Sequence, residues 1–358
     1  MNDYQLWFAM AKLSYKIKNK LIDLYGNAEN IWYAFINESI EVNKAEILYE
    51  KFRTAWNVKK IDEIKRVMYK DNIEAIVIND ELYPEKLRIY DEAPYMLFYK
   101  GDIDCLFENT VSIVGSRKAT YYGENITKIL CDSFADNNIT VVSGMAKGID
   151  TYAHEKILAV KGKTCAVLGS GVNVVYPKEN YGLYEEITQK GCVISQFLPG
   201  EPPYAYNFPV RNKIISALSS LIIVVEASDR SGSLITAGAA LEQGKDVMAV
   251  PGDIFSKQSV GCNKLIKDGA YVLTSLEDVY EVLKMNTFVK KTPLNKQNNV
   301  NEASVYSYIL NKPLHINDLL KKVNLNITTL YEVLFNLELK KKIMRISGDY
   351  YVRVYDKM

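Results

Sequence analysis

The chain has 358 residues, 48% of them apolar, which is enough for two or three domains that each bury a core. Its formal net charge of +1 excludes a globally basic field, so any charge that binds nucleic acid has to be concentrated locally. No signal peptide is evident, and no uninterrupted apolar run approaches the ~18 residues of a membrane span. We therefore expect a cytoplasmic protein with no membrane partner.

Residues 1–65 are predicted to form a small helical domain. One amphipathic helix is expected over residues 15–25, before a break at Gly26 and Asn27, and another over residues 31–35. The pattern resembles small modules of the SAM or helix-hairpin-helix type, some of which bind the DNA backbone. A module that only packs against the rest of the protein is an equally open alternative.

Residues 66–288 are predicted to form an α/β domain with a Rossmann-like parallel sheet. Short apolar runs rich in β-branched residues alternate with helical stretches, which is the βαβ rhythm. The runs do not alternate apolar with polar residues, so both faces of the strands should be buried, as in a parallel sheet. The expected strands are residues 75–78, 111–114, 140–143, 165–168, 192–195, 221–225, 246–250 and 271–273.

The carboxyl-terminal part is predicted to be a polar linker over residues 289–300 and a winged-helix domain over residues 301–358. Helices are expected over 302–310, 316–323 and 328–342, and two short strands over 343–346 and 350–354. Winged helices usually bind DNA through the third helix. Here that helix carries Glu332 and Glu338 on its outer face, so we expect protein contact or weak support of DNA binding.

Glycine-rich turns follow several of the expected strands. Glycine lets the backbone come close to a ligand, and the amides that open the next helix point into the same space. Because the carboxyl ends of parallel strands share one edge of a sheet, these turns should together form an anion site. The turns include Gly115, Ser116 and Arg117, then Ser143, Gly144 and Lys147, then Gly169 and Gly171, and finally Ser231 and Gly232.

A segment with one aromatic residue and two cations opens the helix before the strand at 221–225. Arg211 and Lys213 offer phosphate partners, and Phe208 offers a ring face to a base. On residue types alone, the alternative is equally open that Phe208 belongs to the core and Arg211 to a surface ion pair.

Familiar nucleotide and catalytic motifs do not fit. Residues 162–164 end like a Walker A loop but precede a strand, and no GxGxxG follows the first strand. Asp150 and His154 share a helix face with no nucleophile or metal ligand beside them, which favours a structural role. With only two histidines and five scattered cysteines, we expect no catalytic residue, no metal and no cofactor, and buried thiols in a reducing cytosol.

Taken in order, motifs between Val114 and Ala270 resemble the DNA processing protein A family, DprA or Smf. The resemblance is carried by residues 114–117, 142–144 with 148–150 and His154, 176–177 with Asn180, 208–212, 231–237, 249–252, and Gly261 with Asn263, Leu265, Ile266, Gly269 and Ala270. The family binds single-stranded DNA and delivers it to the RecA recombinase in natural transformation. Its members have an extended Rossmann-like domain, usually act as dimers and are not known as enzymes.

The resemblance implies a DNA-binding role for individual side chains. Arg117 would grip a phosphate, Arg211 and Lys213 would add positive charge, Phe208 would stack on a base, and residues 143–144 would donate hydrogen bonds. The full implied set is Gly115, Ser116, Arg117, Ser143, Gly144, Lys147, Gly169, Gly171, Phe208, Arg211, Asn212, Lys213, Ser231 and Gly232.

Three positions depart from the family pattern. Lys213 stands where many members have arginine, Ala205 where a basic residue is frequent, and Gln196 where an acidic residue is usual. Lysine keeps the charge but lacks the planar fork of arginine, so these changes bear on the strength of binding.

A Rossmann-like nucleotide phosphoribohydrolase of the lysine-decarboxylase-like group is the alternative function. Its signature is a Pro-Gly-Gly-x-Gly-Thr run with a glutamate soon after. Residues 231–236 read Ser-Gly-Ser-Leu-Ile-Thr, and Glu242 lies further on, which argues against nucleotide hydrolysis.

Overall fold

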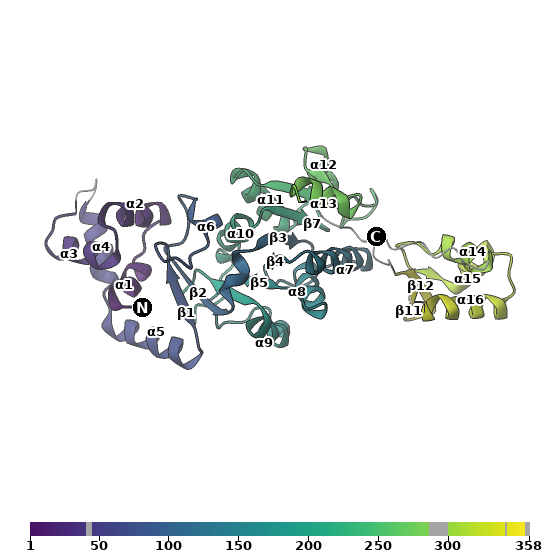
Figure 1. Ribbon diagram of the computed structural model, residues 1–358, viewed down its shortest axis with the longest axis horizontal. Coiled ribbons are helices and arrows are strands. Elements are labelled where there is room, and N and C mark those ends of the chain that lie inside the picture. The colour runs from purple at the N-terminus through teal and green to yellow at the C-terminus, as the bar shows by residue number, and fades with distance from the viewer. Residues whose placement is uncertain (41–44, 286–299, 341, 355–358) are drawn as a thin grey trace.

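A nine-stranded sheet forms the centre of the computed structural model, which describes residues 1–40, 45–285, 300–340 and 342–354 (Figure 1). Its strand order is β1-β2-β6-β5-β4-β3-β7-β8-β9. The strands are β1 (Glu74–Val77), β2 (Met96–Gly101), β3 (Asn109–Val114), β4 (Ile139–Ser143), β5 (Thr164–Val167), β6 (Cys192–Ser195), β7 (Leu221–Val224), β8 (Asp246–Ala249) and β9 (Tyr271–Val272).

The predicted α/β fold is confirmed, and every expected strand of the central region is present within a residue or two. Strand β2 was not predicted, and it changes one edge of the sheet. It pairs antiparallel with both β1 and β6, whereas the pairs from β6 to β9 are parallel, so the sheet is mixed. An antiparallel neighbour needs no crossover helix, so the βαβ rhythm carries no signal for it.

Helices cover both faces of the sheet, and in β3, β7 and β8 alternate residues belong to opposite cores. Val111 and Ile113 of β3 belong to a cluster with α7 (Tyr121–Asp136), α8 (Ile149–Ala159) and α13 (Leu276–Val282). Val114 belongs to the other cluster, with α10 (Asn207–Leu218), α11 (Gly232–Glu242) and α12 (Val260–Lys267). The expectation of strands buried on both faces is therefore confirmed. Helix α9 (Tyr181–Lys190) packs beside α8 and next to β6.

The amino-terminal module contains five helices within the described residues. They are α1 (Asp3–Met10), α2 (Tyr15–Tyr25), α3 (Ala28–Ile36), α4 (Ala45–Ala55) and α5 (Val58–Lys70). Its core is aromatic: the indole Nε1 of Trp7 donates to the carbonyl of Phe52 over 3.0 Å, and Phe8 meets Tyr95 edge-on. The module thus packs against the β1–β2 edge. The predicted domain boundary at residue 65 falls inside α5, which continues to Lys70.

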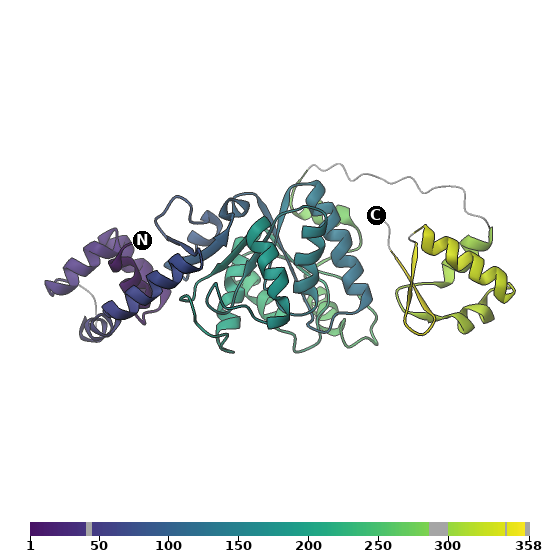
Figure 2. The ribbon, with the colours of Figure 1, turned by 90° about the horizontal axis from the view of Figure 1, so that it is seen from below.

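The carboxyl-terminal unit, yellow in Figure 2, has its own core. It comprises α14 (Val300–Tyr308), α15 (Ile316–Lys322), α16 (Ile327–Leu339) and the sheet β10-β12-β11, built from Leu314–His315, Tyr350–Arg353 and Ile343–Ile346. These are the helices and the hairpin expected of a winged helix, with β10 added, although the assignment as a winged helix stays a prediction. The predicted linker lies almost entirely outside the described residues.

Two further expectations can be compared with the structure. Every cysteine has a free thiol and is buried, as predicted. Among the described helices, none combines the length and the apolar character that crossing a bilayer requires.

Ile223 tests the central core. Its side chain is fully buried in β7 beside Ile113 of β3. Ile223→Ala should lower the free energy of unfolding by about 2–5 kcal/mol, because it removes apolar contacts and leaves a cavity. Urea denaturation followed by circular dichroism measures this. Val160→Ala, at a position 39% exposed, is the control and should change stability by no more than about 0.5 kcal/mol.

Candidate functional site

The sheet changes its direction of winding between β3 and β7. From β3 the chain proceeds through β4, β5 and β6 to one side, and it then returns to β7, β8 and β9 on the other side. Loops after β3 and β7 consequently diverge at the carboxyl edge of the sheet, which is where open α/β sheets bind ligands. The β3–β7 pairing is in register from Val111 with Leu221 to Val114 with Val224, so the two loops start at the same level.

A pocket of about 660 Å³ occupies this crevice. Its lining comes from the loop after β3, the first turn of α10, the loop after β7 and the first turn of α11. The sequence-predicted residues that it brings together are Gly115, Ser116, Arg117, Phe208, Arg211, Asn212, Ser231 and Gly232.

The charge of the pocket is mostly positive. Arg117, Lys118 and Arg230 are exposed at its rim, and Arg211 is buried in its floor. Of the described residues that line it, Asp150 is the one with a carboxylate. In the part of the chain that the structure describes, neither Arg117 nor Arg230 takes part in an ion pair. Lys118 and Arg230 were missed, although each adjoins a predicted loop residue, so extending each loop motif by a residue would have included them.

Arg211 is a structural cation, not the exposed phosphate partner that was expected. It is 5% exposed, and its Nη1 donates to the carbonyls of Gly144, over 2.7 Å, and Val167. Burial lowers the pKa of Arg211 to about 10, while Asp150 opposes this shift and Arg117 adds to it. Arg211 therefore stays charged at neutral pH and joins the ends of β4 and β5 beneath the pocket.

Asp150 completes this floor. Its Oδ2 accepts hydrogen bonds from the amides of Gly144 (3.2 Å) and Ala146 (3.4 Å). Burial raises the pKa of Asp150 to about 6, against the attraction of Arg211. The carboxylate is ionised at neutral pH and stabilises the turn after β4.

His154 is likewise structural. Its Nδ1 lies 2.7 Å from the Thr164 hydroxyl, and burial lowers its pKa to about 3, with Arg211 acting in the same direction. The imidazole is fully buried and neutral at physiological pH, and it does not line the pocket. The geometry supports the structural interpretation of the Asp150 and His154 pair over an acid–base one.

Phe208 forms a wall of the pocket and is only half-buried. A Cβ atom at Gly169 would lie 2.8 Å from its Cδ1, so Gly169 has to be glycine for the ring to sit there. The Tyr176 ring, 44% exposed, is centred 5.6 Å from that of Phe208, and the Arg211 guanidinium lies 5.7 Å from it. The pocket therefore offers an aromatic surface between cations, and Tyr176 is a lining residue that was missed.

Several predicted residues lie outside the pocket. Ser143 is fully buried and donates its hydroxyl to the carbonyl of Ile113, so it cannot serve a ligand as expected. The amide of Gly144 is used by Asp150. Lys147 pairs with Glu179 over 2.8 Å. Gly169 and Gly171 allow close packing, against Phe208 and against the backbone of residues 198–201, and are not part of the lining.

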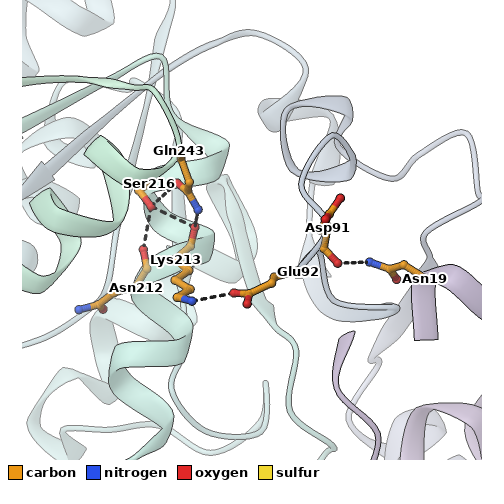
Figure 3. Close-up of polar contacts among 7 residues, drawn as sticks. All are labelled: Asn19, Asp91, Glu92, Asn212, Lys213, Ser216 and Gln243. Carbon is orange, nitrogen blue, oxygen red and sulfur yellow. Dashed lines mark hydrogen bonds and ion pairs between the residues drawn. The ribbon is translucent and has the colours of Figure 1, made fainter. Parts of the chain in front are cut away.

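Lys213 points away from this pocket, which corrects the expectation that it binds DNA together with Arg117, Phe208 and Arg211. Its Nζ lies 2.6 Å from Glu92 Oε2 (Figure 3), and Lys213 lines a neighbouring cavity. The helical spacing explains the difference, since residues two apart on α10 face different directions. Arg117, Phe208 and Arg211 do converge on one pocket.

Helix α11 points its amino terminus at the pocket. Ser231 is its N-cap, with the side chain accepting from the amide of Ser233, as the predicted helix start implies. Across the pocket, Ser116 accepts a hydrogen bond from the amide of Lys118 and donates to Gln258 over 2.7 Å. Backbone amides, a helix dipole and exposed guanidinium groups together make a site for phosphate groups. Within the described residues no cluster of side chains could hold a metal ion.

Comparison with known proteins places this site in context. A family model, DNA recombination-mediator protein A, matches residues 74–284. DNA processing protein DprA of Streptococcus pneumoniae is 45% identical over 56% of this chain and 71% of its own length. Protein Smf of Escherichia coli is 42% identical over 59% of this chain and 57% of its own length.

Two solved structures resemble the chain. The X-ray structure of DNA processing protein A from Streptococcus pneumoniae is 34% identical, has a TM-score of 0.67 and covers 80% of this chain and 99% of its own. A structure of DNA processing protein A from Helicobacter pylori, which concerns its single-stranded DNA binding mode, is 28% identical, has a TM-score of 0.54 and covers 59% and 95%.

Gly144 tests the floor of the pocket. An added Cβ would lie 2.8 Å from Asp150 Oδ2 and 2.9 Å from Arg211 Cζ. Gly144→Ala should therefore lower the free energy of unfolding by about 1–3 kcal/mol, as overpacking does. The matched control is Gly238→Ala in α11, where an added Cβ meets nothing within 4 Å. That variant should gain about 0.5–1 kcal/mol from helix propensity. Equal urea midpoints for the two variants would contradict the close packing.

Proposed function

Because the chain belongs to the DNA recombination-mediator protein A family, we propose that it binds single-stranded DNA through the pocket between β3 and β7. The observation that carries this proposal is the convergence of Arg117, Lys118 and Arg230 with the half-buried ring of Phe208 at the amino terminus of α11. Proteins that bind single strands combine a positive groove for the backbone with aromatic rings for the bases. The single-stranded DNA binding mode of the Helicobacter pylori relative supports the same ligand.

Binding in this pocket should depend little on base sequence. The exposed groups are guanidinium, ammonium and backbone amide donors, which contact phosphate, and one ring, which stacks on any base. Buried Arg211 and Asp150 form hydrogen bonds within the floor of the pocket, so few of their donors and acceptors remain for the edge of a base.

The wider role follows from the family. We propose that the protein helps to load RecA recombinase onto the bound strand in DNA processing or natural transformation, and that it acts as a homodimer in the cytoplasm. We propose binding without catalysis, because Glu242, the first glutamate after the loop that precedes α11, lies in the last turn of that helix and lines the neighbouring cavity instead of this pocket.

Arg117 tests the phosphate contact. Arg117→Ala should weaken binding to all single strands alike and flatten the dependence of log affinity on log salt by about 0.7 per lost contact. Fluorescence anisotropy with labelled oligothymidylate over a salt series measures both. Lys190→Ala removes an exposed cation on α9, away from the pocket, and should leave the slope unchanged. An affinity and a slope that stay at the wild-type values in Arg117→Ala would remove this residue from the site.

Phe208 tests the stacking contact. Phe208→Ala should weaken binding by about 1–3 kcal/mol with little change in the salt slope, because a ring face is lost and no charge. The same titration gives the affinity, and circular dichroism checks the fold. If the variant unfolds, Phe208→Leu keeps the apolar bulk against Gly169 and still lacks the ring. Wild-type affinity in a folded Phe208→Leu would contradict stacking.

A further inference from the structure

A second cavity, of about 460 Å³, lies next to the pocket between β3 and β7, which we call the cationic pocket. Its walls come from α10, the end of α11, the beginning of α2 and the segment between α6 (Glu85–Arg88) and β2. A shallow depression connects the two. It shares Pro209 and Ile235 with the cationic pocket, and Val210 and Lys213 with the second cavity. A continuous trough therefore runs along α10 from the proposed phosphate site to Lys213.

Lys213 stands where the trough enters the second cavity, and it already holds an anion. Its ammonium lies 2.6 Å from the Glu92 carboxylate, with the two side chains 47% and 63% exposed (Figure 3). Exposed ion pairs of this kind contribute little to stability and exchange readily for another anion. A phosphate group would offer Lys213 the same charge with more acceptor oxygens.

The backbones that carry Glu92 and Lys213 are each held in place by a neighbouring side chain. Asn19 of α2 donates from Nδ2 to the carbonyls of Asp91 and Ala93, each over 3.0 Å, as Figure 3 shows for Asp91. On the other side, the carbonyl of Lys213 accepts from Gln243 Nε2 over 3.0 Å. The carboxylate can thus leave Lys213 by side-chain rotation alone, without any change in the fold.

The other charged residues that line the second cavity let Glu92 determine whether the cavity carries a net negative charge. Lys16 and Lys213 face Asp91, Glu92 and Glu242 there, so acidic groups are in excess while Glu92 is present and in balance once it is neutral. A polyanion leaving the cationic pocket meets a repulsive field at this point. Removal of one carboxylate would remove the excess.

We propose that Lys213 is a second phosphate subsite for a nucleic-acid strand that follows the trough, and that Glu92 occupies this subsite as an internal anion until a phosphate replaces it. The inference rests on the proposed binding of single-stranded DNA. Glu92 then sets how far along α10 the bound strand extends, and so how strongly the protein holds long strands.

A double-mutant cycle on the full chain tests this, with an oligothymidylate longer than the ~4–16 nucleotides that single binding folds occupy. Glu92→Gln should bind about two- to fivefold more tightly, in line with the modest strength of an exposed pair. Its salt slope should steepen by about 0.7 for one added phosphate contact. The gain should vanish in Glu92→Gln/Lys213→Gln, which should bind no better than Lys213→Gln alone.

Asp91→Asn is the matched control, because it removes one charge from the same loop but from the partner of Lys16. Any gain that it brings should persist in the Lys213→Gln background. The inference is overturned if Glu92→Gln leaves affinity and slope unchanged, or if its gain survives the loss of Lys213. Absence of strand binding by the wild-type protein would instead overturn the proposed function on which the inference rests.

Discussion

The buried guanidinium of Arg211 is the contact on which the pocket depends. Taking a charged group out of water costs several kcal/mol unless its hydrogen bonds and its charge are compensated. Arg211 meets this requirement with two backbone carbonyls, those of Gly144 and Val167, and with the nearby carboxylate of Asp150. Because those carbonyls end β4 and β5, the guanidinium sets the distance between the two loops. Arg117, Lys118 and Arg230 at the rim then lie above a floor whose loops are held apart by the hydrogen bonds of Arg211.

This division between buried and exposed charge separates two tasks. Arg211 and Asp150 use their hydrogen bonds within the protein, so they shape the site and add an almost neutral pair to it. Arg117 and Arg230 are exposed and keep their donors for a ligand. Arginine suits both tasks, since its planar fork can satisfy two carbonyls at once in the floor or grip a phosphate at the rim.

The amino-acid sequence was sufficient for the architecture and for the edge that carries the site. Buried strands such as β3 and β7 are continuous apolar runs, and the glycine turns after them mark the crevice. Strand β2 was not predicted, because a strand that pairs antiparallel at the edge needs no helical crossover that the sequence pattern could reveal. The structural roles of Ser143 and Lys213 were not predicted for a different reason. A motif names residue types, whereas the hydrogen bond of Ser143 to Ile113 and the pairing of Lys213 with Glu92 depend on partners distant in the sequence.

The net charge of +1 is compatible with a strongly positive pocket because charge is paired unevenly over the protein. Lysines elsewhere are neutralised across loops and helices, as in Lys147 with Glu179, Lys156 with Glu124 and Lys163 with Glu108. Their fields cancel within a few ångströms and contribute little at a distance. Arg117 and Arg230 project over a crevice whose one carboxylate is matched by Arg211. Among the residues that the structure describes, the positive field between β3 and β7 therefore arises because Arg117 and Arg230 have no acidic partner in an ion pair, and a count of basic residues along the chain could not have located it.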